Sequence, residues 1–422
     1  MSQFPKTIAV LTGFPPTRDN VVWPSALPYH LLQYAPGGVS IHLFYFRGDQ
    51  KNRAGWEAGF RALPLAAVTE FTPFMGRRER WWYQFKNLGR PRMPPQIDWF
   101  PVRAKDVQAI QAVCPDALWV YPNWLTPWVR PLSIARTVVT GPDSGVLHHE
   151  RAISALEARV SGASEGGAAA ELERSRQSRG EYAALERELL RTGAQVHVVG
   201  APDATRFDTL ARDCRIAAAK PAIFTPHPHY HYMPVRQSLD RAQGKLKVFI
   251  NGHAGAVYIG DHGTRMVQGL IAQAAGLRDQ FTLEFVGQQW ERSVAALVRA
   301  GFTAEQRTWV DDYPSALAAA DIALGLYAVG VGTKGKILQA MATGLLTLGS
   351  ALAFENIAAQ AGMDYLLYQQ PEEIGNLLVQ VAADRPTHAR IAARGAVAVR
   401  HYHSPAVTAS AFWRLFELSE SV

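Results

Sequence analysis

A glycine-rich segment with two lysines is the part of the sequence best suited to chemistry. Residues 330–336 read GVGTKGK, and a short apolar run, 322–327, comes just before them. Glycines let a backbone turn tightly and approach a ligand closely. The free N–H groups and positive dipole end of a following helix attract anions, and lysine adds a point charge. The segment therefore predicts a phosphate pocket, with an ordinary turn and two solvated lysines as the alternative.

The residues around this segment predict a strand, a loop and a helix, in that order. The run 322–327 is short and apolar, which is typical of a buried strand. After the loop, Ile337, Leu338 and Met341 fall on one face of a helix that is expected to end at Gly344. This order places the start of the helix directly behind the glycines.

Length and composition indicate a globular protein of about two domains. The chain has 422 residues, and 48% of them are hydrophobic, enough for sizeable cores. No apolar run approaches the roughly 18 residues of a membrane span, and the first residues lack the apolar core of a signal peptide. Cys114 and Cys214 match no metal or redox spacing and are expected to be reduced core residues. Together these features predict a cytoplasmic protein.

The net charge of +7 falls entirely within residues 1–160. Much of it lies in residues 76–94, where arginines alternate with tryptophan, tyrosine and phenylalanine. Such a segment suits an anionic membrane surface, because the rings sit at headgroup depth and the guanidinium groups pair with phosphate. The same aromatic residues could instead cap the core. Contact of Arg77–Arg92 with the inner face of a membrane and core capping both stay open, and no nucleic-acid partner is expected.

Strands and helices alternate along the rest of the chain, which predicts an α/β fold with parallel sheets. Expected strands lie at 7–12, 41–46, 117–120, 137–139 and 195–199, and then at 246–250, 281–286, 307–310, 322–327, 345–348 and 365–368. Residues 161–170 predict a mobile segment before a charged helix at 181–191, and residues 351–361 predict another helix. The loops 13–20 and 140–145 follow strands, so we expect them at the edge of a sheet where ligands bind.

A proline-rich stretch from 220 to 245 is the expected linker between the two domains. It holds His227, His229 and His231 at alternate positions, a spacing that could bind a metal in an extended chain. No carboxylate or cysteine accompanies these histidines, and metal ligands need oriented partners. We therefore predict no metal site.

The second half of the chain resembles the donor-binding domain of GT-B glycosyltransferases, mainly the family-4-like enzymes of bacterial polysaccharide assembly. The match covers about residues 246–350. It rests on KILQAMATGLLT at 336–347, which is similar to the family pattern K-x-x-E-A-M-A-x-G-x-P-V-V. The first half resembles the family through GFPP at 13–16 and the turn at 140–144. The segment 336–339 is also similar to that of the glucuronosyltransferase of xanthan assembly.

The resemblance implies two Rossmann-like domains that face a cleft. Residues 1–232 would bind the acceptor, residues 233–402 the nucleotide-sugar donor, and the helix 403–422 would cross back onto the first domain. The implied activity is metal-independent hexosyl or uronosyl transfer to a lipid-linked or glycan acceptor. The co-substrate would be a nucleotide-sugar, with UDP favoured over GDP, and no cofactor is expected.

The resemblance also implies roles for particular residues. Gln339 would hold the ribose, Lys336 would lie near the diphosphate, and Asp143 would activate or orient the acceptor, with His253 as a second catalytic candidate. Asp143 could instead cap the helix that starts near residue 146. The expected donor-binding residues are Asn251, Gly252, Gly287, Val310, Tyr313, Gly332, Thr333, Lys334, Lys336 and Gln339. The expected acceptor-binding residues are Phe14, Arg18, His148 and His149.

Three departures from the family pattern bear on catalysis. Gln339 replaces a glutamate, so its hydrogen bond to a ribose lacks charge assistance. The usual arginine and lysine are missing from Asn251–Gly260, and no glutamate occurs in Tyr327–Gly330. Neutralising a diphosphate would fall to Lys334, Lys336 and the helix start, and the stereochemistry stays open. A GT-B nucleotide-sugar epimerase and a non-catalytic nucleotide-sugar or glycan-binding relative are the alternatives.

Overall fold

The computed structural model describes residues 4–19, 24–48, 53–74, 76, 79, 81, 91–160, 166–230, 239 and 244–417. The chain divides into two compact units. Unit 1 consists of Met1–Ile153, Ser164–Pro228 and Pro405–Val422, and unit 2 of Ser154–Ala163 and His229–Ser404. Each unit has its own sheet and its own hydrophobic core, so each is described separately below.

Unit 1 is built on a parallel sheet with β1 near its centre. Within the described residues the strand order is β3-β2-β1-β4-β5-β6-β7. The strands are β1 (Thr7–Thr12), β2 (Ser40–Phe46), β3 (Ala67–Phe71), β4 (Ala117–Tyr121), β5 (Arg136–Thr140), β6 (Gln195–Val198) and β7 (Ile223–Phe224). In the register, Ile8 lies opposite both Ile41 of β2 and Ala117 of β4.

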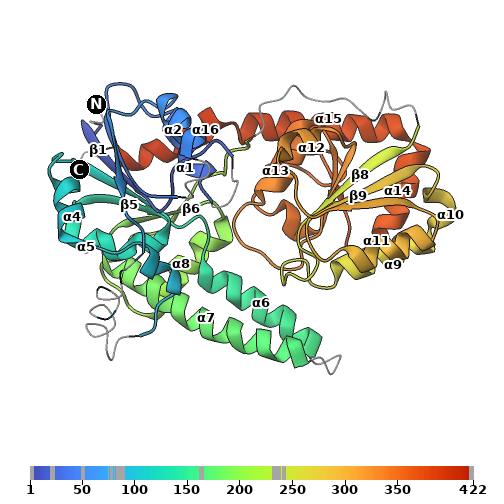
Figure 1. The fold of residues 1–422 in the computed structure, drawn as a ribbon, viewed down its shortest axis with the longest axis horizontal. Helices are drawn as coiled ribbons and strands as arrows, with labels where there is room; N and C mark the ends of the chain where they lie inside the picture. Colours follow the sequence, from blue (N-terminus) through green and yellow to red (C-terminus); the bar gives the residue numbers. More distant parts are fainter. Residues whose placement is uncertain are drawn as a thin grey trace. The chain divides into compact units, whose positions relative to one another are not determined.

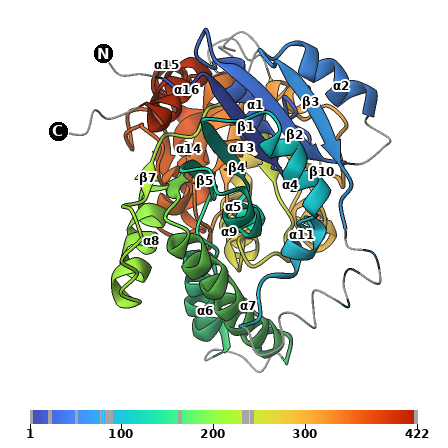
Figure 2. The same ribbon diagram turned by 90° about the vertical axis from the view of Figure 1, so that its left-hand side faces the viewer.

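Helices cover both faces of this sheet, because successive strand residues point to opposite sides. Ala9 and Leu11 of β1 pack toward one face, and Ile8 and Val10 toward the other. Figures 1 and 2 show the two helix layers. The first layer holds α4 (Ala104–Gln111), α5 (Val129–Leu132), α7 (Gly166–Arg191) and α8 (Ala201–Asp213), and the second holds α1 (Ala26–Gln33), α2 (Arg53–Arg61) and α16 (Pro405–Trp413).

The last described residues of the chain pack into the core of unit 1. The ring of Phe412 on α16 lies 4.5 Å from that of Trp119 on β4. The indole nitrogen of Trp413 donates to the carbonyl of Leu31 at 2.8 Å, and Arg136 donates to the carbonyl of Phe416 at 2.8 Å. The aromatic residues near the C terminus are therefore part of the second helix layer of this sheet.

Unit 2 is a second parallel sheet with the order β10-β9-β8-β11-β12-β13 among the described residues. Its strands are β8 (Leu246–Asn251), β9 (Phe281–Val286), β10 (Thr303–Arg307), β11 (Ile322–Gly325), β12 (Leu346–Gly349) and β13 (Leu366–Leu367). One face packs against α9 (His262–Ala272), α11 (Glu291–Arg299) and α14 (Glu373–Ala383). On the other face lie α12 (Tyr313–Ala318) and α13 (Gly335–Thr343). Helix α15 (Arg385–Tyr402) contributes to both cores, through Ala392 on the first face and Val399 on the second.

Three expectations about local structure are wrong. Residues 166–170, expected to be mobile, begin the 26-residue helix α7, which also contains the whole helix expected at 181–191. The strand expected at 307–310 lies earlier, at Thr303–Arg307, because this polar edge strand lacks an apolar run. The helix expected at 351–361 is only a short 3-10 turn, Ala351–Phe354, since Asn356 adopts a left-handed φ of 67°.

Neither of the two cysteines is fully buried. Cys114 is exposed and Cys214 is half-buried, so the expectation that both are core residues is wrong.

Among the described residues, none of the helices combines the length and apolar character that crossing a bilayer requires.

A buried histidine links strands β5 and β6 of unit 1 to Thr225, the residue after β7. The ring nitrogens of His197 on β6 lie 2.9 Å from the hydroxyl of Thr140 on β5 and 2.7 Å from that of Thr225. Trp119 donates to the same Thr140 hydroxyl at 2.9 Å, and the ring of Phe412 covers the imidazole at 4.9 Å. Burial, reinforced by His227, lowers the pKa of His197 to about 3. The histidine is therefore neutral in the folded protein at ordinary pH.

Acidification should destabilise unit 1 through His197. An unfolded histidine has a pKa of about 6.5, so below this pH the unfolded chain binds a proton that the folded chain excludes. Between pH 7 and pH 5 this linkage should remove about 2 kcal/mol of stability. Because His149 and Glu186 also change their linkage over this range, and do so equally in both proteins, the measured quantity is a difference. On going from pH 7 to pH 5, denaturant unfolding should show the wild type losing about 2 kcal/mol more stability than His197→Gln, whose amide can still bond both threonines. The exposed-site control His401→Gln should behave as the wild type; an equal loss in His197→Gln contradicts the prediction.

Candidate functional site

Two loops meet at one edge of the unit 2 sheet. Strands β8 and β11 are neighbours and run parallel, with Ile322 opposite Val248. Their carboxyl ends therefore lie at the same edge, followed by the loop that begins at Asn251 and by the glycine-rich loop before α13. The sequence predicted this strand, loop and helix order, and the structure confirms it.

The start of α13 leaves backbone N–H groups open. Ile337 and Leu338 donate to the carbonyl of Lys334, and the helix has no side-chain cap. Within the described part of the chain, no acceptor is found for the N–H groups of Gly335 and Lys336. At the other end, Gly344 closes the helix in the left-handed conformation, with φ of 88°. Open N–H groups at a helix start favour an anion.

The two lysines of the glycine-rich loop have different surroundings. Lys334 is buried, and its ammonium donates to the carbonyls of Val331 at 3.3 Å and Gly332 at 3.0 Å, with Glu355 at 3.7 Å. Asn356 also donates to the carbonyl of Gly332, at 3.1 Å. In this structure Lys334 is thus part of the loop's own framework, next to Gly332, whose φ is 61°.

Lys336, by contrast, is exposed on the first turn of α13. Its ammonium lies 5.8 Å from the centre of the Tyr313 ring. Although the side chain is exposed, the protein atoms around its ammonium group partly desolvate it, and this desolvation lowers the pKa of Lys336. This lysine is therefore the one placed to supply charge beside the open N–H groups. Gln339 follows it by three residues, on the same side of the helix, and is half-buried.

Tyrosine hydroxyls hold the loop after β8. Asn251 donates through its side chain to the hydroxyl of Tyr313 at 3.0 Å, and the backbone N–H of His253 donates to that of Tyr258 at 2.8 Å. Burial raises the pKa of Tyr313, which keeps its hydroxyl protonated. Nδ1 of His253 is buried, with no hydrogen-bond partner among the described residues. Asn251, Tyr313 and Lys336 are thus brought together, and Val310 is half-buried three residues before Tyr313.

Two glycines let the loops after β8 and β9 cross. Gly252 and Gly287 have φ values of 129° and 138°, which side chains rarely adopt. A Cβ on Gly287 would collide with the carbonyl oxygen of Gly252, which also accepts the indole N–H of Trp290 at 2.8 Å. Gly287 therefore shapes the site through close backbone approach.

Sequence reasoning missed the residues that support this edge. Tyr258, Glu355 and Asn356 hold the two loops, and Arg400 donates to the carbonyl of Ala342 at 2.8 Å near the end of α13. Only Tyr258 had a local signal, as a tyrosine in the loop after the first strand of the unit. The other three act from distant segments.

In unit 1 the expected acceptor residues also follow strands. Phe14, after β1, packs edge-on against Trp124 at 6.5 Å and Phe100 at 5.5 Å. The carbonyl of Arg18 contacts the ring of His30 at 2.8 Å. Asp143 is half-buried in the turn between β5 and α6 (Gly145–Val160). Strands β1, β4 and β5 are neighbours, so these turns share one sheet edge.

Asp143 lies among tyrosines, and Ser144 caps the following helix. Burial raises the pKa of Tyr121 and of Tyr182, and the charge of Asp143 adds to both shifts. The hydroxyl of Ser144 accepts from the N–H of Leu147 at 3.2 Å. The N-terminal cap that was the alternative role for Asp143 is therefore filled by Ser144.

The two histidines at the start of α6 have their rings 5.1 Å apart. The ring of His149 also lies 5.5 Å from that of Tyr182. Burial, with a smaller effect of His148, lowers the pKa of His149 to about 4. His149 is therefore neutral near pH 7 and could contact a substrate as a hydrogen-bonding group without charge.

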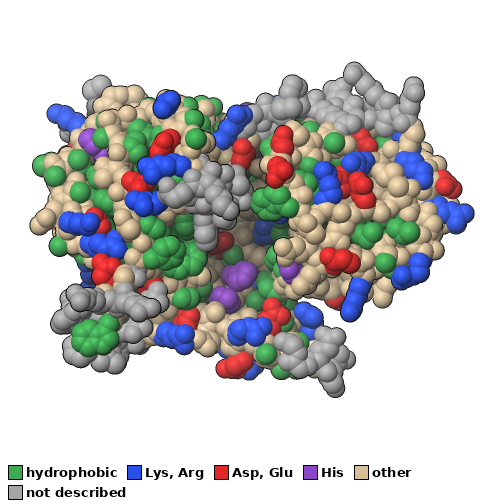
Figure 3. Space-filling view, viewed as in Figure 1, with side chains coloured by type: hydrophobic (Ala, Val, Ile, Leu, Met, Phe, Trp, Pro, Cys, Tyr) green, Lys and Arg blue, Asp and Glu red, His purple; other side chains and the backbone are tan. Residues whose placement is uncertain are grey.

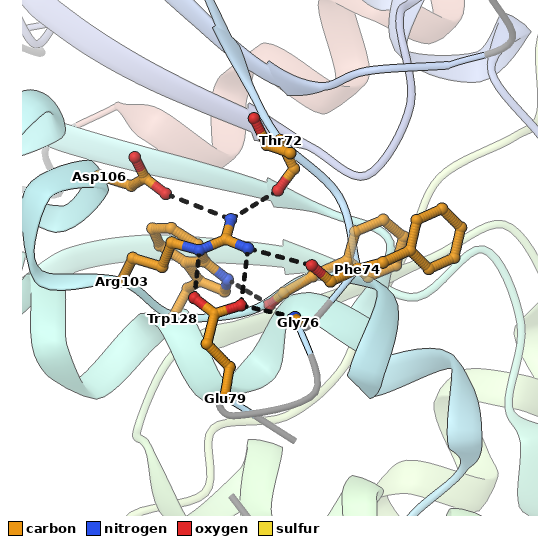
Figure 4. A network of polar contacts seen from close by, with 8 residues as sticks. Thr72, Phe74, Gly76, Glu79, Arg103, Asp106 and Trp128 are labelled. Atoms are coloured by element: carbon orange, nitrogen blue, oxygen red, sulfur yellow. Dashed lines mark hydrogen bonds and ion pairs between the residues drawn. The ribbon is translucent and has the colours of Figure 1, made fainter. Parts of the chain in front are cut away.

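An arginine anchors the backbone just after β3, where the arginine-rich segment begins. Figure 4 shows the guanidinium of Arg103 between Glu79 and the carbonyls of Thr72 and Phe74, which it contacts at 2.6–3.1 Å. Arg92 forms an ion pair with Glu181 at 3.0 Å. Most of the segment Arg77–Arg92 lies outside the described residues, so its membrane contact stays a prediction. On the face seen in Figure 3, basic and acidic side chains are interspersed.

The two described histidines of the linker, His227 and His229, form hydrogen bonds with backbone carbonyl groups. Nδ1 of His227 lies 2.8 Å from the carbonyl of Pro228, and the N–H of His229 donates to the carbonyl of His403 at 2.8 Å. His231 lies outside the described residues. In the parts of the chain that are described, no group of three His, Cys, Asp or Glu side chains could hold a metal ion.

Comparison with known proteins identifies the fold. Residues 265–413 match the family model described as glycosyl transferase-like. No curated protein sequence matches the chain significantly. Among solved structures, HepE of Anabaena in complex with UDP has a TM-score of 0.61 at 16% identity, covering 96% of this chain and 98% of HepE. HepE is also known in complex with UDP-glucose.

Two other solved structures are similar over the same extent. Sucrose-phosphate synthase from Thermosynechococcus elongatus has a TM-score of 0.61 at 13% identity, covering 97% of this chain and 98% of the synthase. A glycosyltransferase from Rickettsia africae has a TM-score of 0.61 at 9% identity, covering 99% and 100%. With its two parallel α/β units, the chain therefore has the GT-B fold.

The crossing of the two loops in unit 2 predicts a sharp stability effect. Gly287→Ala should cost at least about 3 kcal/mol, because it adds both an unfavourable φ and a backbone collision. Gly276→Ala is the matched control, since its Cβ would meet only Val379 at 3.8 Å; it should gain up to about 1 kcal/mol. Thermal unfolding of both variants tests this, and equal melting temperatures would contradict the role of Gly287.

Proposed function

We propose that this GT-B protein, with its glycosyl transferase-like segment over residues 265–413, transfers a hexosyl or uronosyl group from a UDP-sugar to an acceptor hydroxyl. The acceptor class that we infer is a lipid-linked sugar or glycan of polysaccharide or glycoconjugate assembly. A cytoplasmic location, with membrane contact through Arg77–Arg92, belongs to the same proposal.

The open start of α13 carries the proposal. A nucleoside diphosphate leaving group needs its developing negative charge stabilised, and oriented N–H groups with a nearby cation do so. Gly335 and Lys336 supply the N–H groups and Lys336 the cation, with Gly332 and Thr333 in the preceding loop. In this proposal these groups provide the charge stabilisation without a metal ion, and Lys334 contributes by holding the loop in shape.

The remaining donor contacts follow from the same edge of the sheet. Gln339 is assigned to the ribose, Val310 and Tyr313 to the neighbourhood of the base, and Asn251 to the sugar or phosphate. Gly252 and Gly287 set the backbone path beside them. UDP is favoured over other nucleotides because HepE, which shares the fold, binds UDP and UDP-glucose.

Activation of the acceptor is assigned to unit 1. An ionised carboxylate can take the proton of an attacking hydroxyl, and Asp143 is a half-buried carboxylate at the carboxyl edge of that sheet. Phe14, Arg18, His148 and His149 are assigned to acceptor contacts. His253 is the second catalytic candidate, because its buried Nδ1 has no partner among the described residues.

Gln339 supports a second candidate, binding of a nucleotide-sugar without transfer. An amide in place of the family's glutamate, and the absence of arginine and lysine from Asn251–Gly260, both weaken the stabilisation of a leaving group. A nucleotide-sugar epimerase is the other enzyme class with this fold. UDP-glucose that is bound but never consumed favours the binding protein, and conversion without an acceptor favours the epimerase.

UDP affinity should depend on Lys336. A hydrogen bond or ion pair to a charged group contributes about 1.5–3 kcal/mol, so Lys336→Ala should weaken UDP binding roughly ten- to a hundredfold. Calorimetric titration with UDP measures the change. Lys336→Arg should retain most of the affinity.

Lys245→Ala is the control for this experiment. Lys245 immediately precedes β8, at the opposite edge of the sheet, where its ammonium donates to the carbonyl of Arg278 at 2.7 Å. The variant should bind UDP as the wild type does. Unchanged affinity in Lys336→Ala, with the wild type binding UDP, would remove the assignment of the diphosphate to α13.

A further inference from the structure

Side chains of the protein bind three of the N–H groups at the start of α6 in unit 1. The N–H of Ser144 donates to Oδ1 of Asp203 at 2.7 Å, and the N–H of Val146 donates to Oε1 of Glu186 at 3.2 Å. The hydroxyl of Ser144 donates to Glu186 at 3.0 Å while it accepts from Leu147. Two carboxyl groups thus occupy donors that an anionic ligand would otherwise use.

Both carboxyl groups are completely buried and come from distant segments. Glu186 lies on α7 and Asp203 on α8, and neither side chain has any exposed surface. A buried carboxyl is costly unless it is hydrogen-bonded or neutralised. The Ser144 turn supplies hydrogen bonds to both carboxyl groups.

The same carboxyls fasten the turn that carries Asp143. The N–H of Gly141 donates to the carbonyl of His197 at 3.0 Å, and the carbonyl of Pro142 accepts from Val199 at 3.2 Å. Ser144 is held by Glu186 and Asp203 on the other side of Asp143. A Cβ at Gly145 would collide with the ring of Tyr182, so the backbone also packs tightly there. Residues on both sides of Asp143 are therefore fixed.

The charged and titratable groups around Glu186 define its protonation. Burial raises its pKa to about 8, while the bonds from Val146 and Ser144 and the charge of Arg206 oppose the shift and Asp203 adds to it. Arg206 is itself paired with Glu150, at 2.7 and 2.9 Å. Tyr182, whose pKa rises mainly through burial, feels the charges of both Asp143 and Glu186. Glu186 is thus a neutral acid near pH 7.

We propose that Glu186 is a positioning residue for acceptor activation. Its protonated carboxyl ties the first turn of α6 to α7 and so holds the backbone of Asp143 in place without adding its own negative charge to those of Asp143 and Asp203. This inference rests on the proposed role of Asp143 as the acceptor-side base. Asp203 assists by binding the N–H of Ser144, and the closed helix start directs unit 1 toward an uncharged hydroxyl.

Hydrolysis of UDP-glucose, with water as the acceptor, tests the proposal in the full-length protein. Glu186→Leu removes the acceptor oxygens and should lower the rate roughly tenfold or more, a fraction of what general base catalysis contributes. UDP affinity should not change, because the proposed UDP site lies in unit 2. Glu186→Gln keeps an acceptor oxygen without a charge and should stay close to the wild-type rate at pH 7.

The pH profile separates positioning from a structural role. The wild-type rate should fall above pH 8, where Glu186 ionises beside Asp203, and Glu186→Gln should lack this fall. Infrared spectra should show a protonated carboxyl band that disappears over the same pH range and is absent from the glutamine variant. Glu188→Leu, on the same helix with a half-buried carboxyl that pairs with Arg130, is the control and should leave rate and profile unchanged.

Failure of the proposed transfer and failure of the role of Glu186 give different results. Wild-type protein that binds UDP-glucose but neither hydrolyses it nor transfers glucose to added glycan or lipid-linked acceptors contradicts the proposed transfer, and the role of Glu186 with it. Wild-type turnover that a folded Glu186→Leu variant matches overturns the inference on Glu186 alone. A glutamine variant that loses activity as the leucine variant does, or that keeps the alkaline fall, overturns it as well.

Discussion

The first N–H groups of a helix have no acceptor within the helix. Helix α6 of unit 1 and helix α13 of unit 2 differ in whether side chains of the protein supply these acceptors. In unit 1, at the start of α6, the N–H groups of Ser144, Val146 and Leu147 are bonded to Asp203, Glu186 and the Ser144 hydroxyl, respectively. In unit 2 the N–H groups of Gly335 and Lys336 have no acceptor among the described residues. Since an open helix start favours an anion, this difference supports phosphate binding in unit 2 and hydroxyl chemistry in unit 1.

Keeping a helix start open requires a rigid loop in front of it. The ammonium of Lys334 donates to the carbonyls of Val331 and Gly332 in its own loop, and the side-chain amide of Asn356 also donates to the carbonyl of Gly332. These contacts satisfy carbonyl oxygens that would otherwise repel a phosphate. Lys336, two residues on, stays exposed. The two lysines of the motif therefore differ in role: Lys334 stabilises the loop, and Lys336 lies beside the proposed phosphate site.

Much of the framework follows from local pattern. The strands expected at 7–12 and 281–286 have those bounds, and Gly344 ends α13 in the left-handed conformation that a glycine there predicts. Failures occur where local signals are weak. Strand β10 is polar because it lies at the sheet edge. Helix α7 begins with two glycines that look like a linker, followed by alanines that favour a helix. In both cases tertiary packing decides, since the segment alone is ambiguous.

The sequence by itself determined the alternation of strands and helices, the GT-B resemblance and the glycine-rich motif with Lys336, because these depend on neighbouring residues and on short periodicities. Only the tertiary structure decided which lysine is buried, that Ser144 caps α6, and that Glu186 stays protonated. Glu186 and Asp203 meet Ser144 from 42 and 59 residues away. Their partners and the pKa of Glu186 depend on burial and on long-range approach, which no local pattern specifies.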